Sequence, residues 1–102
     1  MIQAVFFKNK KNITGFEIKN HGTDIVCSAV SILSLNTVNS LEAFTNVKYN
    51  LDYDINGGFL KCIIKEDTLC EKAILLLSSF ELGLKGIEAE YAKDICLKYK
   101  EV

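Results

Sequence analysis

The stretch NHGTDIVCSAVS, residues 20–31, stands where a predicted strand ends and a long predicted helix begins. It contains His21, the only histidine of the chain, six residues before Cys27. A glycine interrupts the strand pattern after the histidine, and Thr23 or Asp24 can cap a helix by accepting a hydrogen bond from a backbone N–H. The stretch therefore predicts a strand, a short polar turn and a helix whose first turn carries Cys27.

A cysteine in the first turn of a helix has the surroundings of a reactive thiol. The unpaired backbone N–H groups there and the helix dipole stabilise negative charge, and a nearby imidazole adds to this effect and can carry the proton. We therefore predict that Cys27 is a nucleophile and that His21 is its general base, and then the acid that protonates the leaving amine. Backbone N–H groups at the start of the helix could bind the oxyanion of a tetrahedral intermediate.

The competing interpretation of Cys27 is packing, since a small apolar cysteine in a helix is commonly a core residue. Cys27, Ser31 and Ser34 stand at positions i, i+4 and i+7, so that small side chains form one stripe of the helix. A buried stripe would carry Leu or Ile, as the other side of this helix does. We therefore expect this stripe to be the floor of a cleft, and the rest of the helix, apart from its polar end, to be buried.

Asp24 and Ser31 are supporting candidates. Asp24 could cap the helix or orient His21, and capping is the simpler interpretation. Ser31, one turn after Cys27, could hydrogen-bond the thiolate or a substrate carbonyl, or it could be a small packing residue. The residues alone leave these alternatives open.

The segments GFEIKNH (residues 15–21) and DIVCSAVS (residues 24–31) together resemble the ribosomal-processing cysteine protease family, Prp. Members of that family carry Gly-His-Ala, a loop, and then Asp-Ile-Val-Cys-Ala-x-Val-Ser. Residues 79–84, SFELGL, are similar to the family's second helix, so the resemblance extends over the whole chain. Asn20 stands where glycine is usual and Gly22 where alanine is usual, and the loop before the cysteine is several residues shorter.

The resemblance implies a cysteine endopeptidase that removes the N-terminal extension of large-subunit ribosomal protein L-twenty-seven during ribosome assembly. It also implies a homodimer, and it places Cys27 and His21 at the family's two reacting positions. The cleaved segment is apolar and aromatic, which an exposed groove lined by strand residues would suit. The short loop leaves about two free residues between the histidine and the helix, too few for a lid.

Two other functions compete with this one. A non-catalytic module that binds a ribosomal protein or an assembly factor is favoured by the short loop and by Asn20. A redox or sensing role for Cys27 would require Cys62 or Cys70 to approach it in space. We rank the protease first, the binding module second and the redox role third.

Length and composition limit these functional hypotheses. The 102 residues fit a single domain over residues 1–102, and 49% hydrophobic residues suffice for one core. A net charge of −1 gives no basic face for direct contact with nucleic acid. No signal peptide or long apolar span is recognised, so we expect a cytoplasmic protein without a membrane partner.

The four cysteines are scattered, without a Cys-x-x-Cys pair. Together with a single histidine, this spacing predicts neither a disulfide framework nor a zinc site, and we expect no metal and no cofactor. Packing is the simplest role for Cys62, Cys70 and Cys96.

The order of predicted elements is ββαββαβ. Alternation predicts strands over residues 2–8, 13–19, 47–54, 59–65 and 95–100, and helical spacing predicts a helix from Asp24 to about Asn46. A second helix opens at Thr68, where residues 68–71 have the capping-box pattern. Its predicted core face is formed by Leu69, Ala73, Leu76, Phe80, Leu84 and Ile87. This order predicts an α+β two-layer sandwich with two helices on one face of a largely antiparallel sheet. His21 stands at a strand end, where alternation does not decide which way its side chain points.

Overall fold

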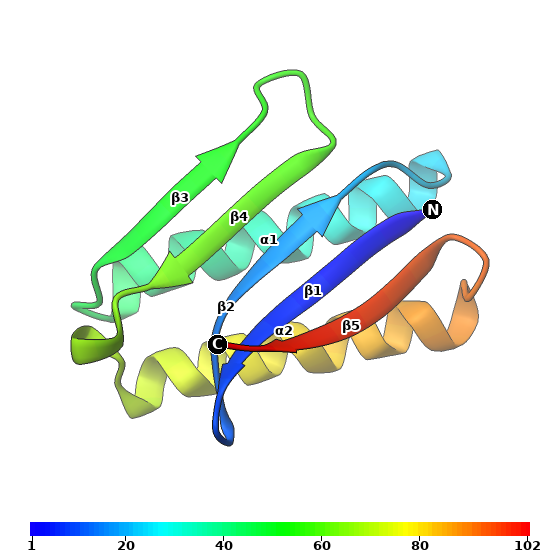
Figure 1. Ribbon diagram of the computed structural model, residues 1–102. Coiled ribbons are helices and arrows are strands. Elements are labelled where there is room, and N and C mark those ends of the chain that lie inside the picture. The colour runs from blue at the N-terminus through cyan, green and yellow to red at the C-terminus, as the bar shows by residue number, and fades with distance from the viewer.

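Five strands and two long helices make up the computed structural model, which describes residues 1–102 (Figure 1). The strands are β1 (Ile2–Asn9), β2 (Asn12–Lys19), β3 (Tyr49–Tyr53), β4 (Phe59–Ile64) and β5 (Ile95–Glu101). The helices are α1 (Asp24–Phe44) and α2 (Glu71–Glu90), and a short 3₁₀ helix, η1 (Glu66–Thr68), precedes α2. The predicted α+β class and the order of the main elements are confirmed.

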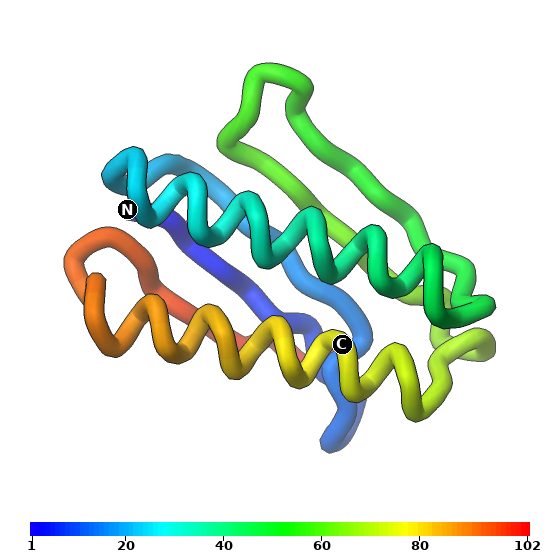
Figure 2. The backbone as a smooth tube through the Cα atoms, turned by 180° about the vertical axis from the view of Figure 1, so that it is seen from behind, coloured from blue at the N-terminus to red at the C-terminus, as the bar shows by residue number.

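The strands form one sheet in the order β3-β4-β2-β1-β5. The pairs β1–β2, β2–β4 and β3–β4 are antiparallel, and only β1–β5 is parallel. A parallel partner requires a crossover, which α2 completes by carrying the chain from β4 past β2 and β1 to β5 at the far edge of the sheet. Figure 2, seen from behind, shows both helices in front of the same face of the sheet. The predicted two-layer arrangement is therefore confirmed.

The core lies between the sheet and the helices. Phe6 of β1 and Phe16 of β2 both pack on Phe80 of α2, with ring centroids 5.6 and 4.6 Å apart. Alternation accounts for this, because every second residue of a strand points to the same face. The buried face of β2 carries Phe16 and Ile18.

Helix α1 is less buried than the sequence indicates. Ile25 and Ile32 are 62% and 68% exposed, although Val26 and Val30 are buried against the sheet. The sheet and α2 cover only part of the helix, and no further layer covers its outward face (Figure 2). The expectation that only the small-residue stripe and the polar end would be exposed was wrong.

The same helix corrects a second expectation. α1 has 21 residues and contains an 18-residue window with a mean hydropathy of 1.3, so it is long and apolar enough by composition to cross a membrane, although no such span was recognised in the sequence. The core helix of a folded protein passes the same test, and Val26, Val30 and Leu41 place α1 in the core.

The start of α2 differs from the predicted capping box. The helix begins at Glu71, with Cys70 at the N-cap position and no side-chain capping bond. The Thr68 hydroxyl instead accepts a hydrogen bond from the Lys48 N–H at 3.0 Å and donates to the Lys65 carbonyl at 2.7 Å. Hydrogen bonds to the residues just before β3 and just after β4 therefore occupy the group that the pattern assigned to the helix.

Candidate active site

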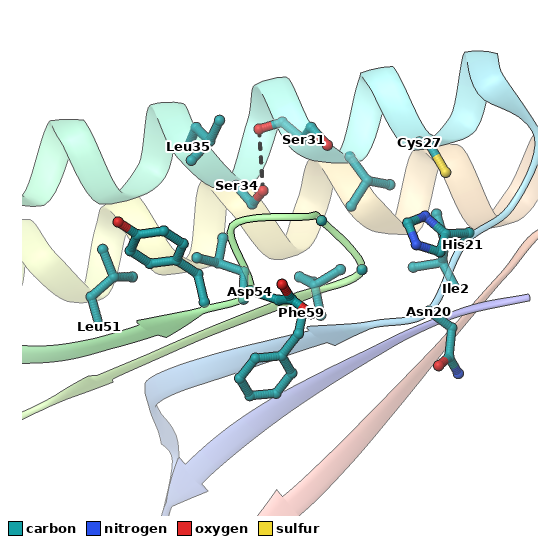
Figure 3. A pocket seen from close by; sticks show the side chains of 16 residues that line it. Ile2, Asn20, His21, Cys27, Ser31, Ser34, Leu35, Leu51, Asp54 and Phe59 are labelled. Atoms are coloured by element: carbon teal, nitrogen blue, oxygen red, sulfur yellow. Dashed lines mark hydrogen bonds between the residues drawn. The ribbon is translucent and has the colours of Figure 1, made fainter.

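A cavity of about 590 Å³ lies between α1 and the β3–β4 hairpin, and we call it the hairpin cavity (Figure 3). Its α1 side includes Cys27, Ser31 and Ser34, so the predicted small-residue stripe does line a cleft. The strand side and the rest of the wall are mainly apolar, with Ile18, Val30, Leu35, Leu51, Tyr53, Phe59 and Leu60. The cavity therefore has a small polar margin and an apolar interior.

His21 reaches this cavity because β2 ends in a sharp turn. Asn20 has φ +71°, in the left-handed region, and its N–H donates to the Gly58 carbonyl at 2.9 Å. Asparagine adopts this conformation more readily than most residues other than glycine. The departure from the usual glycine at Asn20 is thus accommodated, and the turn directs the His21 side chain into the cavity.

Cys27 lies at the end of the first turn of α1, as predicted. Its N–H donates to the Thr23 carbonyl at 2.8 Å, which closes that turn. Its Sγ accepts a hydrogen bond from the Gly22 N–H at 3.2 Å and lies 3.5 Å from the Gly22 carbonyl oxygen. The same residue can therefore accept from a thiol and donate to a thiolate, and a backbone N–H stabilises charge on the sulfur.

Cys27 and His21 lie at the same end of the hairpin cavity (Figure 3). No hydrogen bond joins the sulfur to the imidazole. The histidine ring instead lies against the turn of the β3–β4 hairpin, where Gly57 and Gly58 also line the cavity. The structure thus brings together the two predicted reacting groups without pairing them directly.

The two supporting candidates have different surroundings. Ser31 lines the cavity, and its carbonyl accepts a hydrogen bond from the Ser34 hydroxyl at 3.2 Å. Asp24 is not among the residues that line the cavity, and its carboxylate bonds neither to His21 nor to a helix N–H. Thr23 holds the N-cap position, also without a side-chain capping bond. Asp24 still places negative charge in the first turn, which the helix dipole favours.

Sequence reasoning missed the contribution of the β3–β4 hairpin to this site. The two strands of this hairpin were predicted over residues 47–54 and 59–65. Nothing in the pattern indicated that Leu51 and Tyr53 would form the wall opposite Cys27 or that the turn would contact His21. These contacts join segments far apart in the sequence, which periodicity cannot detect.

The remaining cysteines lie outside the cavity. Cys62 is fully buried in β4, and burial raises the pKa of its thiol to about 11. Cys70 and Cys96 are half-buried, and all four cysteines are free thiols. No three His, Cys, Asp or Glu side chains are arranged to hold a metal ion.

A cysteine at the start of a helix, a histidine in the same cavity and apolar walls able to hold a peptide describe the class of cysteine proteases. The model of the family described as cysteine protease Prp matches residues 1–96. The chain therefore belongs to the Prp family and is a cysteine protease, which sets aside the non-catalytic binding module.

Individual relatives agree with this assignment. The ribosomal processing cysteine protease Prp of Staphylococcus aureus is 36% identical over 80 residues, which are 78% of this chain and 74% of that protein. A crystal structure of Prp from Staphylococcus aureus with a covalently linked product peptide has a TM-score of 0.91 at 30% identity, covering 98% of this chain and 100% of that one. A Streptococcus mutans protein has a TM-score of 0.88 at 32% identity, covering 100% and 99%. Prp from Staphylococcus aureus with a substrate peptide gives 0.87 at 26% identity, covering 98% and 100%.

Proposed function

We propose that this protease removes the N-terminal extension of large-subunit ribosomal protein L-twenty-seven during ribosome assembly, with Cys27 as nucleophile and His21 as general base. The observation that carries the proposal is the convergence of both side chains at one end of a peptide-sized, apolar cavity. The covalent product complex of the Staphylococcus aureus relative supports nucleophilic catalysis. We propose further that the enzyme acts in the cytoplasm, where ribosomes are assembled, and as a homodimer.

The reaction follows from the chemistry of the two groups. His21 takes the thiol proton of Cys27, and the sulfur attacks the scissile carbonyl to form a tetrahedral intermediate. The oxyanion of this intermediate is stabilised by backbone N–H groups at the start of α1. Residues 24–26 come before Cys27, whose N–H makes the first bond of the helix, so their own N–H groups have no partner within it. His21 then protonates the leaving amine, and water hydrolyses the thioester to release the second product and restore the thiol.

The cavity walls support an apolar substrate segment. Leu51, Tyr53 and Phe59 lie on the hairpin side, and Leu35 and Val30 on the helix side. Burying an aromatic side chain between such walls contributes roughly 2–3 kcal/mol relative to leaving it in water. An apolar, aromatic extension would therefore bind here more strongly than a charged one.

The test is incubation of the protein with the extended ribosomal protein, read by mass spectrometry. We expect one cleavage near the N-terminus, lost in Cys27→Ala and in His21→Ala. Cys96→Ala is the matched control, because Cys96 is half-buried like Cys27 but lies on β5 outside the cavity. Cleavage by either cavity variant would contradict the assigned residues, and an intact substrate with the wild-type protein would contradict the assigned substrate.

A further inference from the structure

The turn of the β3–β4 hairpin is in close contact with His21. A Cβ atom built on Gly58 would lie 2.6 Å from Nε2 of the imidazole, and 3.3 and 3.4 Å from Cε1 and Cδ2. These are the three atoms at the outer edge of the ring, so the backbone of Gly58 lies beside Nε2 and leaves no room there for a side chain. In Figure 3 the other ring nitrogen lies toward Cys27.

Comparison with the neighbouring glycine distinguishes two constraints on this turn, the backbone conformation and the space beside His21. Gly57 and Gly58 have nearly the same φ, +86° and +85°, which L-residues rarely adopt. A Cβ on Gly57 would lie 3.8 Å from Cε1 of His21, an ordinary contact. Backbone conformation therefore explains both glycines, whereas the lack of space beside the imidazole applies only to Gly58.

A backbone hydrogen bond ties the same glycine to the residue before the histidine. The Asn20 N–H donates to the Gly58 carbonyl at 2.9 Å, directly beyond the pairing of Lys19 with Phe59. Gly58 thus holds both the backbone that leads into His21 and the edge of its ring. A shift of this turn would move the imidazole relative to Cys27.

We propose that Gly58 is a positioning residue for His21, and that its missing side chain lets the turn backbone hold the imidazole with its other nitrogen toward Cys27. The effect on rate rests on the proposed role of His21 as general base, because such a base must stand within hydrogen-bond reach of the proton it takes. The effect on the position of the ring does not depend on that role.

The experiment compares Gly58→Ala with Gly57→Ala. Both variants force an L-residue to a φ near +85°, but only the first places a methyl group against His21. Because the chain has one histidine, its ring signals can be followed by NMR without assignment of other histidines. We expect the ring signals to shift in Gly58→Ala and to stay near the wild-type values in Gly57→Ala. We also expect kcat on the precursor to fall at least about tenfold more in Gly58→Ala, with similar KM.

A double-mutant comparison tests the contact without relying on activity. Gly58→Ala should lower the Tm more than Gly57→Ala does, and this difference should vanish in the His21→Ala background, where the imidazole is absent. If the alanine variants do not fold, Gly58→Asn and Gly57→Asn replace them, because asparagine accepts positive φ more readily. Equal ring signals and equal Tm values for the two glycine variants would overturn the proposal. Cleavage by His21→Ala would instead overturn the general-base role, while the ring signals would still report on the position of His21.

Discussion

At the scale of single residues, the Cys27 side chain is held by its own turn. The Gly22 N–H donates to Sγ, and a Cβ on Gly22 would lie 3.0 Å from the Asp94 carbonyl oxygen. That oxygen already accepts a hydrogen bond from the Ile2 N–H at 2.8 Å, so it cannot easily move. A side chain at this position would therefore crowd the Asp94 carbonyl oxygen, which glycine avoids.

The environment of Cys27 predicts that it is the most reactive of the four thiols. Its sulfur lines an open cavity and accepts from a backbone N–H, whereas burial holds the pKa of Cys62 at about 11 and leaves well under 1% of it as thiolate near neutral pH. Alkylation of each cysteine, followed by mass spectrometry between about pH 5 and 9, should modify Cys27 first. Equal rates for Cys27 and the half-buried Cys70 would contradict the nucleophile assignment.

Burial of Cys62 also predicts a dependence of stability on pH. Its folded pKa is raised from 9.0 to about 11, so the unfolded chain loses this proton first as the pH rises. The contribution of the buried neutral thiol is therefore complete below about pH 9 and is lost toward pH 11, an effect of roughly 2–3 kcal/mol. We expect urea unfolding of Cys62→Ala to depend less on pH in this window than wild type. Cys70→Ala should follow wild type, and an unchanged slope for Cys62→Ala would contradict the effect.

At the scale of elements, alternation and helical spacing were sufficient for the order of strands and helices. They were insufficient where a polar group had more than one partner available. Thr68 has the sequence of a capping box, but its hydroxyl bonds to Lys48 and Lys65. β3 begins at Tyr49 rather than at residue 47, because Val47 is buried beyond the end of the ladder, where its N–H donates to the Thr45 hydroxyl.

The candidate site was predictable to the same extent. Cys27, His21 and the small-residue stripe could be identified because they lie close together in the sequence. The contact of His21 with Gly58 could not, since it depends on how far the β3–β4 hairpin reaches over the end of β2. The outward face of α1 was misjudged for a related reason: its apolar residues are as frequent as in a buried helix, and composition does not show which side has no neighbour.

Packing of α2 on the sheet gives a prediction at this scale. Phe80 is 3% exposed and contacts Phe6 and Phe16, whereas Leu82 on the same helix is 72% exposed. Phe80→Ala should lower the free energy of unfolding by about 3–5 kcal/mol, because it leaves a cavity between the layers. Leu82→Ala is the matched control and should change it by roughly 0.5 kcal/mol or less. Similar losses in urea unfolding would show that the outward face of α2 is covered in solution.

At the scale of the whole molecule, the hairpin cavity is built from two separate parts of the chain. The reacting side chains come from the junction of β2 and α1, and the opposite wall comes from β3, β4 and the turn between them. Only Gly22 and Thr23 separate His21 from the first residue of α1. Although this connection is so short, no hydrogen bond joins the imidazole to the sulfur, and the ring lies against the hairpin turn.

This architecture predicts how the enzyme distinguishes its substrates. Two residues between His21 and α1 cannot fold over a bound peptide, so no lid from this segment can complete the site on binding. We expect additional binding energy from surfaces outside the hairpin cavity that a short peptide does not reach, either on a second subunit or on the outer side of the β3–β4 turn. We therefore expect kcat/KM for the intact precursor to exceed that for a peptide spanning the cleavage site by at least about tenfold, which corresponds to ~1.4 kcal/mol of additional transition-state binding.

Steady-state cleavage of the two substrates at equal ionic strength measures the ratio. A precursor with a scrambled mature region but the same extension serves as control and should behave like the peptide. Equal kcat/KM values for all three would mean that the hairpin cavity alone supplies the specificity.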